Sequence, residues 1–371
     1  MVSSSELGGG EETVRLLAKH LDKGRFQVSV VCPPGPMFQR MAEIPDVRLY
    51  EVAFPTVPSI RTVGHLAELI RHERVEILHT HLYHGDLYGF LATRLAPVPR
   101  LVSTIQAINF YWEIEGGTRR LRWRAASLIS RGIYRAFDGL VTCSAALREA
   151  VCTRRGLKIQ RERVTVIHNS IDLEELKPHI QGKPCSHAAG ETGGLHPKRL
   201  IAVANFGKYK GHRVLLQAIA KLRSDSTLEC WLVGDGPERG EMERLARALG
   251  LSDRVRFLGY RQDVPALLRQ CDLFVLPSVW EPFGIALVEA MVLGMPVLAC
   301  WAGGVPEIVR DGETGLLVPP GDADAMAAGL QRLLSDDALR ARLAAKAAPD
   351  AAARFDARSM AERYQKSYEA I

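Results

Sequence analysis

The stretch Ser278-Val-Trp-Glu-Pro-Phe-Gly-Ile-Ala-Leu-Val-Glu289-Ala-Met291 follows a short apolar run and leads into a segment, 285–293, with helical spacing. The apolar run is typical of a buried strand, so the stretch joins a strand to a helix. The backbone N–H groups near Phe283, Gly284 and Ile285 are then expected to point into the crevice at the carboxyl end of that strand. Helix starts of this kind bind phosphate.

The two glutamates of this stretch suit two parts of one ligand. Glu289 lies about one turn inside the helix, roughly 6 Å along its axis, where a carboxylate can accept hydrogen bonds from two ribose hydroxyls. Glu281 precedes the helix and faces whatever lies beyond the phosphates, which predicts a nucleotide-sugar site. The alternative is an acidic residue at a helix start and a solvated surface residue, because exposed glutamate is the common case.

The same stretch resembles the glutamate motif of the retaining glycosyltransferases of family four, which have the GT-B architecture. Seven residues separate the two glutamates, and the Pro-Ser lead-in and the Glu-Ala-Met ending also match. Other segments resemble further landmarks of that family, in the same order. They are 6–10, 78–81, 138–144 and 168–172 on the acceptor side, and 203–212, 232–237, 255–259, 303–307 and 315–319 on the donor side.

Periodicity predicts the same organisation. Strand-like runs alternate with helical stretches, which is typical of parallel sheets covered by helices. The runs are 27–32, 47–52, 75–78, 100–105, 139–142 and 164–167, and then 199–204, 228–233, 255–258, 273–276, 297–299 and 316–318. We therefore predict an α/β protein with two Rossmann-like, doubly wound parallel-sheet domains facing a cleft.

The domain boundaries follow from composition and from the resemblance. Residues 1–180 form the acceptor-side domain, 181–198 a linker rich in Gly, Pro, His and Ser, and 199–350 the donor domain. The resemblance implies that the last helix, 351–371, crosses back to the first domain.

Composition is that of an ordinary globular protein, with 47% hydrophobic and 24% charged residues. No apolar run reaches the roughly 18 residues that span a bilayer, and the start has no secretory pattern. We expect a cytoplasmic protein. The seven cysteines are scattered and odd in number, so they are interpreted as small core residues rather than a disulfide framework or a zinc site.

The glycine segment near the start is a second predicted phosphate contact. Gly9 and Gly10 precede a helix predicted over 11–21, and glycines let the backbone approach a diphosphate closely; the alternative is a flexible terminus. In the family a strand precedes this loop, whereas only Met1 and Val2 precede the serines here. We therefore expect that the first strand is missing and that the native product starts upstream.

Three histidines, His79, His81 and His84, raise the question of a metal site. Strand alternation places His79 and His81 on one side without a carboxylate or cysteine partner, so a metal is disfavoured. His79 is predicted to pack or to hydrogen-bond locally. The resemblance implies that His81 is the active-site histidine near the transferred sugar, with a core histidine as the alternative.

The resemblance also implies a mechanism without metal. No Asp-x-Asp lies at a strand end, and Asp322-Ala-Asp324 is interpreted as a helix cap. Amides and basic side chains must then stabilise the leaving diphosphate. The family uses a lysine at the position of Lys210, and Lys208 is predicted to replace the basic residue that the family commonly has where Asn205-Phe-Gly207 stands here.

The acceptor is suggested by the distribution of charge. Residues 1–180 hold 24 basic and 19 acidic residues and so carry most of the net charge of +6. Six arginines between Arg119 and Arg135 form a run without acids, close to Trp112 and Trp123. A basic stretch with aromatics suits an anionic membrane face or a lipid-linked diphosphate acceptor, and a solvated helix face is the alternative. Nucleic acid is disfavoured because no binding motif accompanies the charge.

These observations predict a retaining hexosyltransferase-type enzyme that moves a sugar from a nucleoside diphosphate to an acceptor hydroxyl in cell-surface polysaccharide or glycolipid assembly, without a cofactor. Glu281 is expected to hold the donor sugar, Glu289 the ribose, and Gly284 and Ile285 the phosphate. Two alternatives stay open: a sugar-nucleotide-binding subunit without turnover, and a nucleotide-sugar epimerase.

Overall fold

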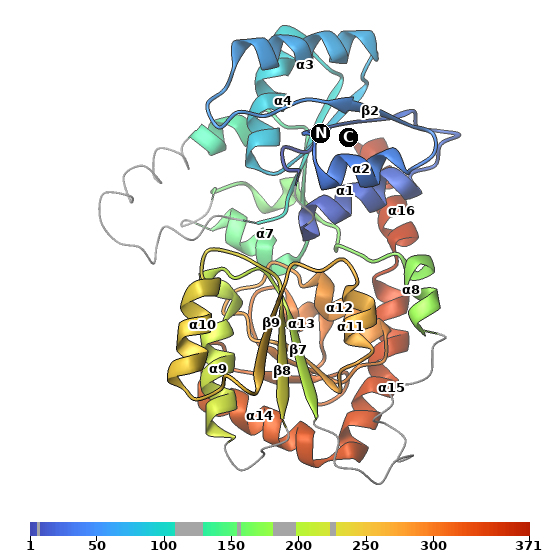
Figure 1. Ribbon diagram of the computed structural model, residues 1–371. Coiled ribbons are helices and arrows are strands. Elements are labelled where there is room, and N and C mark those ends of the chain that lie inside the picture. Colours follow the sequence, from blue (N-terminus) through green and yellow to red (C-terminus); the bar gives the residue numbers. More distant parts are fainter. Residues whose placement is uncertain (6–7, 108–128, 154–156, 181–197, 223–227) are drawn as a thin grey trace. The chain divides into compact units, whose positions relative to one another are not determined.

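The computed structural model describes residues 1–5, 8–107, 129–153, 157–180, 198–222 and 228–371 (Figure 1). The chain forms two compact units. The first unit comprises 1–170 together with 357–371, and the second comprises 171–356. Each is an α/β unit built on parallel strands, which confirms the predicted pair of Rossmann-like sheets.

The first unit contains two groups of parallel strands. In the first group β1 (Val28–Cys32) pairs with β2 (Val47–Glu51). The second group follows the order β3 (Ile77–His81), β4 (Arg100–Ile105), β5 (Gly139–Thr142) and β6 (Val164–Val166). The strands β4 and β5 are buried along nearly their whole length, as expected when helices cover both faces of a sheet.

Met1 and Val2 lie between these two groups. The N–H of Val2 donates to the carbonyl of Val31 at 3.0 Å, and Val2 forms a parallel bridge with His81. The Met1 amine donates to the carbonyl of His79 at 2.7 Å. Two residues therefore hold the place of a strand between β1 and β3.

Helices cover both faces of the first unit. Those whose bounds the structure describes in full are α1 (Gly9–His20), α2 (Pro36–Ala42), α3 (Ile60–His72), α4 (Tyr83–Leu95), α7 (Ala145–Cys152) and α16 (Ala357–Ala370). Helix α16 packs against α1, where Tyr364 and Tyr368 lie with Leu16 and Leu17 in one apolar cluster. Helix α1 begins at Gly9 rather than at residue 11, because Gly8 supplies the extended N-cap conformation.

The second unit is a six-stranded parallel sheet in the order β12-β11-β10-β7-β8-β9. Its strands are β7 (Arg199–Val203), β8 (Glu229–Val233), β9 (Val255–Gly259), β10 (Leu273–Leu276), β11 (Val297–Cys300) and β12 (Leu316–Val318). Every residue of β10 and β11 is buried, which explains why these segments are continuous apolar runs without alternation.

The helices of the second unit pack around this sheet. They are α8 (Leu173–Ile180), α9 (His212–Lys221), α10 (Arg239–Ala248), α11 (Val264–Leu268), α12 (Ile285–Val292), α13 (Val305–Ile308), α14 (Ala323–Ser335) and α15 (Asp337–Arg354). The Asp322 carboxylate accepts from the amides of Asp324 and Ala325 at 2.9 Å each, which confirms that this acidic pair is a helix cap.

The six cysteines among the described residues are all free thiols, and five of them are buried. Burial confirms the interpretation as small core residues for five of them, whereas Cys152 is half-buried and Cys185 lies outside the described residues.

Candidate active site

The helix start predicted from the opening stretch is present in the second unit. Strand β10 ends at Leu276, and Gly284 begins α12 with φ of 112°, a conformation that glycine adopts without strain. The first helical bonds are donated by Leu287 and Val288 to the Gly284 carbonyl. The amides of Ile285 and Ala286 precede these bonds, so they are placed to donate to an anion at the helix start.

Glu281 is a buried carboxylate at the centre of this region, only 6% exposed. Its Oε2 accepts from the Lys210 ammonium at 2.8 Å and from the Ser278 hydroxyl at 3.0 Å. Because burial of a lone charge is costly, the lysine is what makes a buried carboxylate tolerable here. The structure therefore brings together Lys210 and Glu281, two side chains 71 positions apart.

Two glycine segments fix this pair. A Cβ at Gly211, where φ is 68°, would collide with the carbonyl oxygen of Pro277, so only glycine lets the loop of Lys210 approach the loop of Glu281. The Val279 amide donates to the Tyr209 carbonyl at 2.6 Å and joins the same two loops. On the other side the Gly304 amide donates to the Glu281 carbonyl at 2.9 Å.

The segment Asn205-Phe-Gly207 is built around a buried aromatic ring. Phe206 is fully buried and stacks on His212, with ring centroids 4.2 Å apart and an interplanar angle of 10°. Burial, together with the nearby Lys210, lowers the pKa of His212 to about 4, so this imidazole is neutral. The side chain of Asn205 is exposed and Lys208 is an exposed residue of the short helix η2 (Lys208–Lys210).

Two further residues predicted to bind the sugar donor, Phe283 and Glu289, lie on the same strand-to-helix segment. Glu289 is half-buried on the first turns of α12. The ring of Phe283 is buried against Phe355, 5.4 Å between centroids, so this side chain belongs to the core and only its backbone is a candidate for ligand contact. Gly9, Gly10 and His81 belong to the first unit.

His81 ends β3 in the first unit and is almost fully buried. Its Nδ1 has no hydrogen-bond partner among the described residues, and burial holds its pKa well below the usual range. His79 lies on the same side, with ring centroids 4.2 Å apart. The His79 Nδ1 atom bonds the Tyr368 hydroxyl at 2.6 Å, and the His79 Nε2 atom bonds the Thr104 hydroxyl at 2.8 Å. The prediction that His79 is hydrogen-bonded is confirmed, but its partners are distant in the sequence rather than local.

Gly10 lies against a side chain that the sequence analysis missed. A Cβ at Gly10 would lie 3.2 Å from Cγ of Gln106, which follows β4. The Asn169 amide nitrogen donates to Gln106 Oε1 at 2.9 Å, while Gln106 Nε2 and Asn169 Oδ1 are buried without a partner in the described structure. Unpaired buried amide atoms are costly, and such atoms next to a helix start indicate a polar ligand. Gln106 follows the predicted strand 100–105 and Asn169 follows the predicted strand 164–167. This position at a strand end is the feature of the sequence that could have identified them.

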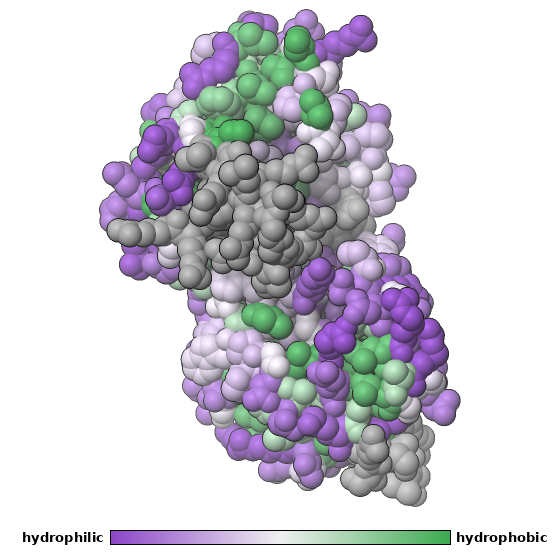
Figure 2. Space-filling model, turned by 90° about the vertical axis from the view of Figure 1, so that its left-hand side faces the viewer, coloured by the Kyte–Doolittle hydropathy of each residue, from purple (hydrophilic) through white to green (hydrophobic). Residues whose placement is uncertain are grey.

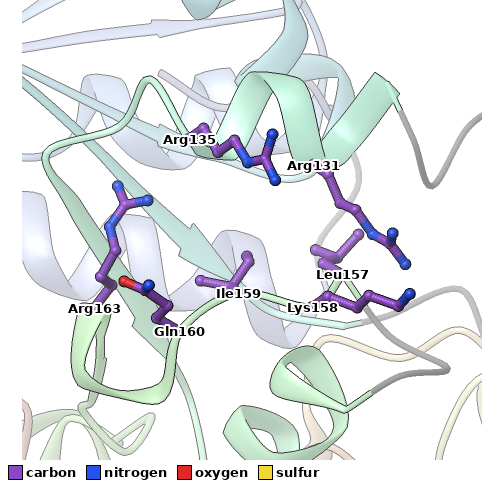
Figure 3. Close-up of a pocket in the computed structure, with 7 residues that line it drawn as sticks. All are labelled: Arg131, Arg135, Leu157, Lys158, Ile159, Gln160 and Arg163. Atoms are coloured by element: carbon purple, nitrogen blue, oxygen red, sulfur yellow. The ribbon is translucent and has the colours of Figure 1, made fainter.

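A basic pocket of about 280 Å³ also lies in the first unit (Figure 3). Its lining consists of Arg131, Arg135, Leu157, Lys158, Ile159, Gln160 and Arg163, with no acid among them. Arg131 and Arg135 are the carboxyl-terminal end of the predicted basic run; Arg119, Arg120, Arg122, Arg124, Trp112 and Trp123 lie outside the described residues.

Within the described ranges, no helix is long and apolar enough to cross a membrane, and no group of three or more His, Cys, Asp and Glu side chains could hold a metal ion. Hydrophilic and apolar side chains are interspersed on the face of the protein in Figure 2.

The fold is that of the glycosyltransferase class, and two family descriptions match the chain. "Glycosyltransferase Family 4" matches residues 7–175 and "Glycosyl transferases group 1" matches residues 193–349. A D-inositol 3-phosphate glycosyltransferase from Mycobacterium sp. (strain JLS) is 30% identical over 316 residues, which cover 81% of this chain and 69% of the relative. The chain belongs to the family-four glycosyltransferases.

Several other curated relatives match about half of this chain. The lipopolysaccharide core biosynthesis glycosyltransferase LpsE of Rhizobium meliloti (strain 1021) is 34% identical over 165 residues, 44% of this chain and 48% of the relative. The chain thus spans about half the length of several curated relatives that it matches. Among solved structures, Anabaena HepE in complex with UDP-glucose has a TM-score of 0.83 at 22% identity, covering 100% of this chain and 98% of that one. That likeness shows the fold.

Proposed function

We propose that this protein is an enzyme that transfers a sugar from a nucleoside diphosphate to an acceptor hydroxyl, with retention of anomeric configuration. The observation that carries the proposal is the buried Glu281, held by Lys210 and Ser278 immediately before the helix start at Gly284. A carboxylate for sugar hydroxyls, a cation and a set of unpaired helix amides are the three features that a sugar diphosphate needs.

The donor would lie along the start of α12. Its diphosphate would accept hydrogen bonds from the amides of Ile285 and Ala286, and Glu289 would accept from the ribose hydroxyls. Both bonds to Glu281 end on Oε2, so Oε1 is the oxygen that would accept from the sugar. The name of one relative, the UDP-Gal:alpha-D-GlcNAc-diphosphoundecaprenol alpha-1,3-galactosyltransferase of Escherichia coli, which is 26% identical over 343 residues, supports a nucleoside-diphosphate donor.

The chemistry would proceed on one face of the sugar. The bond from the anomeric carbon to the phosphate oxygen breaks, a bond to the acceptor oxygen forms on the same face, and the acceptor proton passes to the departing phosphate. The helix amides and Lys210 would stabilise the charge that develops on the diphosphate. No protein nucleophile is needed, and we propose that no metal is needed. Turnover should therefore survive excess chelator; loss with chelator and recovery with magnesium would overturn this part.

We propose that the acceptor binds in the first unit. His81, Gln106 and Asn169 present buried polar atoms without partners among the described residues, and Gly9 and Gly10 open α1 beside Gln106. The basic pocket favours an acceptor or a surface that bears phosphate. We propose a sugar or a lipid-linked sugar as acceptor and a cytoplasmic location with peripheral contact to an anionic membrane.

The test is release of nucleoside diphosphate from a panel of nucleotide sugars that carry different bases and sugars. Glu281→Gln should abolish release, whereas Glu313→Gln, at an exposed ion pair of the same unit, should leave it unchanged. The configuration of the product, followed by proton NMR as it forms, reports on retention.

Two outcomes would favour the alternatives. Binding of nucleotide sugars without release from any donor, with or without sugar acceptors, would support a binding subunit. Interconversion of two sugars on the nucleotide would support an epimerase.

A further inference from the structure

The basic pocket of the first unit lies away from the carboxyl ends of the strands. Its lining residues belong to two segments, 131–135 and 157–163, which precede β5 and β6. These strands are parallel neighbours, so their amino ends meet at one edge of the sheet. The extended segment from Arg163 to Ile167 spans roughly 13 Å, at about 3.3 Å per residue. Asn169, with its unpaired buried amide oxygen, lies beyond the other end of that segment. The pocket is therefore a second site.

Four cationic side chains surround this pocket. Figure 3 shows Arg131 and Arg135 on one side and Lys158 and Arg163 on the other. The side chains of Arg135 and Lys158 make no hydrogen bond or ion pair within the described part of the chain. Arg163 donates to the Phe137 carbonyl at 2.6 Å, which fixes its guanidinium at the rim. Cations held together without an acid repel one another, so the arrangement favours a bound anion.

The backbone of Lys158 is in the left-handed region, with φ of 52°. This conformation is uncommon for a residue with a Cβ, and such strain is concentrated at functional sites. The preceding residue, Leu157, donates its N–H to the Val151 carbonyl at 2.8 Å and so holds the turn in place. Glycine or asparagine would adopt this turn at lower cost. A lysine here is thus favoured by its charge and not by its backbone.

The size and chemistry of the pocket define the group that it would hold. Its volume of about 280 Å³ lies just below the range of about 300 to 1,000 Å³ that is usual for pockets of drug-sized ligands. A phosphate monoester carries a charge of about −1.5 to −2 at neutral pH and three acceptor oxygens. Guanidinium groups match phosphate oxygens in pairs, and Arg131, Arg135 and Arg163 supply three of them. One phosphate group therefore suits the space and the charge.

We propose that this pocket is a binding site for a phosphate monoester, separate from the site of sugar transfer. The phosphate lies between Arg135 and Lys158, and the rest of the molecule that carries it lies outside the pocket. This inference goes beyond the proposed function, because it assigns no reacting group to the pocket and stands whether or not the chain transfers a sugar. Two sources have this chemistry: a soluble phosphate ester, and a lipid headgroup that ends in a phosphate monoester, such as that of phosphatidic acid.

The test is calorimetric titration of the full chain with glycerol 3-phosphate. Arg135→Gln and Lys158→Asn should each weaken binding about tenfold, the effect of losing one charged hydrogen bond. Arg161→Gln is the matched control, because it removes the same charge two positions from Arg163, at a residue that pairs with Glu149 at 3.0 Å and does not line the pocket. The control should change affinity by less than about twofold. Asparagine tolerates the left-handed turn, so the melting temperature of Lys158→Asn should not decrease.

Sedimentation with vesicles then distinguishes the two sources. Sedimentation with phosphatidic acid that exceeds sedimentation with phosphatidylglycerol, and that glycerol 3-phosphate reverses, supports the lipid headgroup. Binding of glycerol 3-phosphate without sedimentation supports a soluble ester. No binding of glycerol 3-phosphate at millimolar concentration would overturn the proposal. Equal weakening by Arg161→Gln and by the pocket variants would also overturn it, because the attraction would then come from overall charge. A Lys158→Asn variant with a lower melting temperature and unchanged affinity would show that Lys158 is structural, and would overturn it too.

Discussion

Replacing Lys210 should destabilise the second unit more than replacing its partner Glu281. The side chain of Glu281 is 8% exposed and that of Lys210 is 22% exposed, with 2.8 Å between Nζ and Oε2. Lys210→Met leaves the more deeply buried group as an unpaired carboxylate, whose remaining side-chain hydrogen bond among the described residues comes from the Ser278 hydroxyl. Glu281→Gln leaves an ammonium group that water reaches more easily.

The magnitudes follow from this difference in burial. Breaking a buried ion pair by removing one partner costs about 3 to 5 kcal/mol. Because the pair is partly reached by solvent, we expect about 3 kcal/mol for Lys210→Met and about 1 to 2 kcal/mol for Glu281→Gln, where a neutral amide still accepts a hydrogen bond. The double variant should cost less than the sum of the two by at least about 1 kcal/mol.

Urea denaturation followed by tryptophan fluorescence measures this cycle, because Trp231, Trp280 and Trp301 lie in the second unit and Trp280 adjoins Glu281. Equal costs for the two single variants, or an additive double variant, would refute the reasoning that Lys210 compensates a buried charge.

Three further predictions concern binding, pH and membranes. Glu289→Ala should weaken nucleoside-diphosphate binding by about 1.5 to 3 kcal/mol, the value of a charged hydrogen bond; unchanged affinity in calorimetry would remove Glu289 from the site. Burial raises the pKa of Asp86 to about 6 from the usual 3.8, so the stability that its neutral form gives is present below pH 3.8 and is lost, by about 3 kcal/mol, as pH rises through 6. Asp86→Asn should flatten the unfolding free energy over this pH range, and an unchanged slope would show that Asp86 does not cause it. Sedimentation with anionic vesicles should decrease with salt and with Arg135→Gln/Lys158→Gln but not with Arg332→Gln on α14, whereas equal sedimentation with neutral vesicles would favour the solvated-helix alternative.

Elements with strong local signals could be predicted from the sequence. Apolar runs in the sequence predict strands at 273–276 and 297–299, and the structure has β10 and β11 there. Gly284 predicts a helix start, and α12 begins directly after it. The strand expected over 75–78 is β3 at Ile77–His81, and Arg74, three residues before this strand, adopts a left-handed turn conformation with φ of 50°.

Contacts between distant segments could not be predicted from local pattern. Tyr368 bonds His79 from 289 positions away, and Gln106 bonds Asn169 from 63 positions away. Each partner is an ordinary polar residue in its own segment. Only the sheet order and the packing of α16 on α1 bring them together.

The central claim is that a donor diphosphate binds at the start of α12. Hydrogen exchange of the amides of Ile285 and Ala286, measured with and without saturating nucleoside diphosphate, tests it most directly. The account predicts that exchange at both amides slows strongly on binding, and that Gly312, in a turn of the same unit, is unaffected. Binding that leaves exchange at Ile285 and Ala286 unchanged would contradict the account.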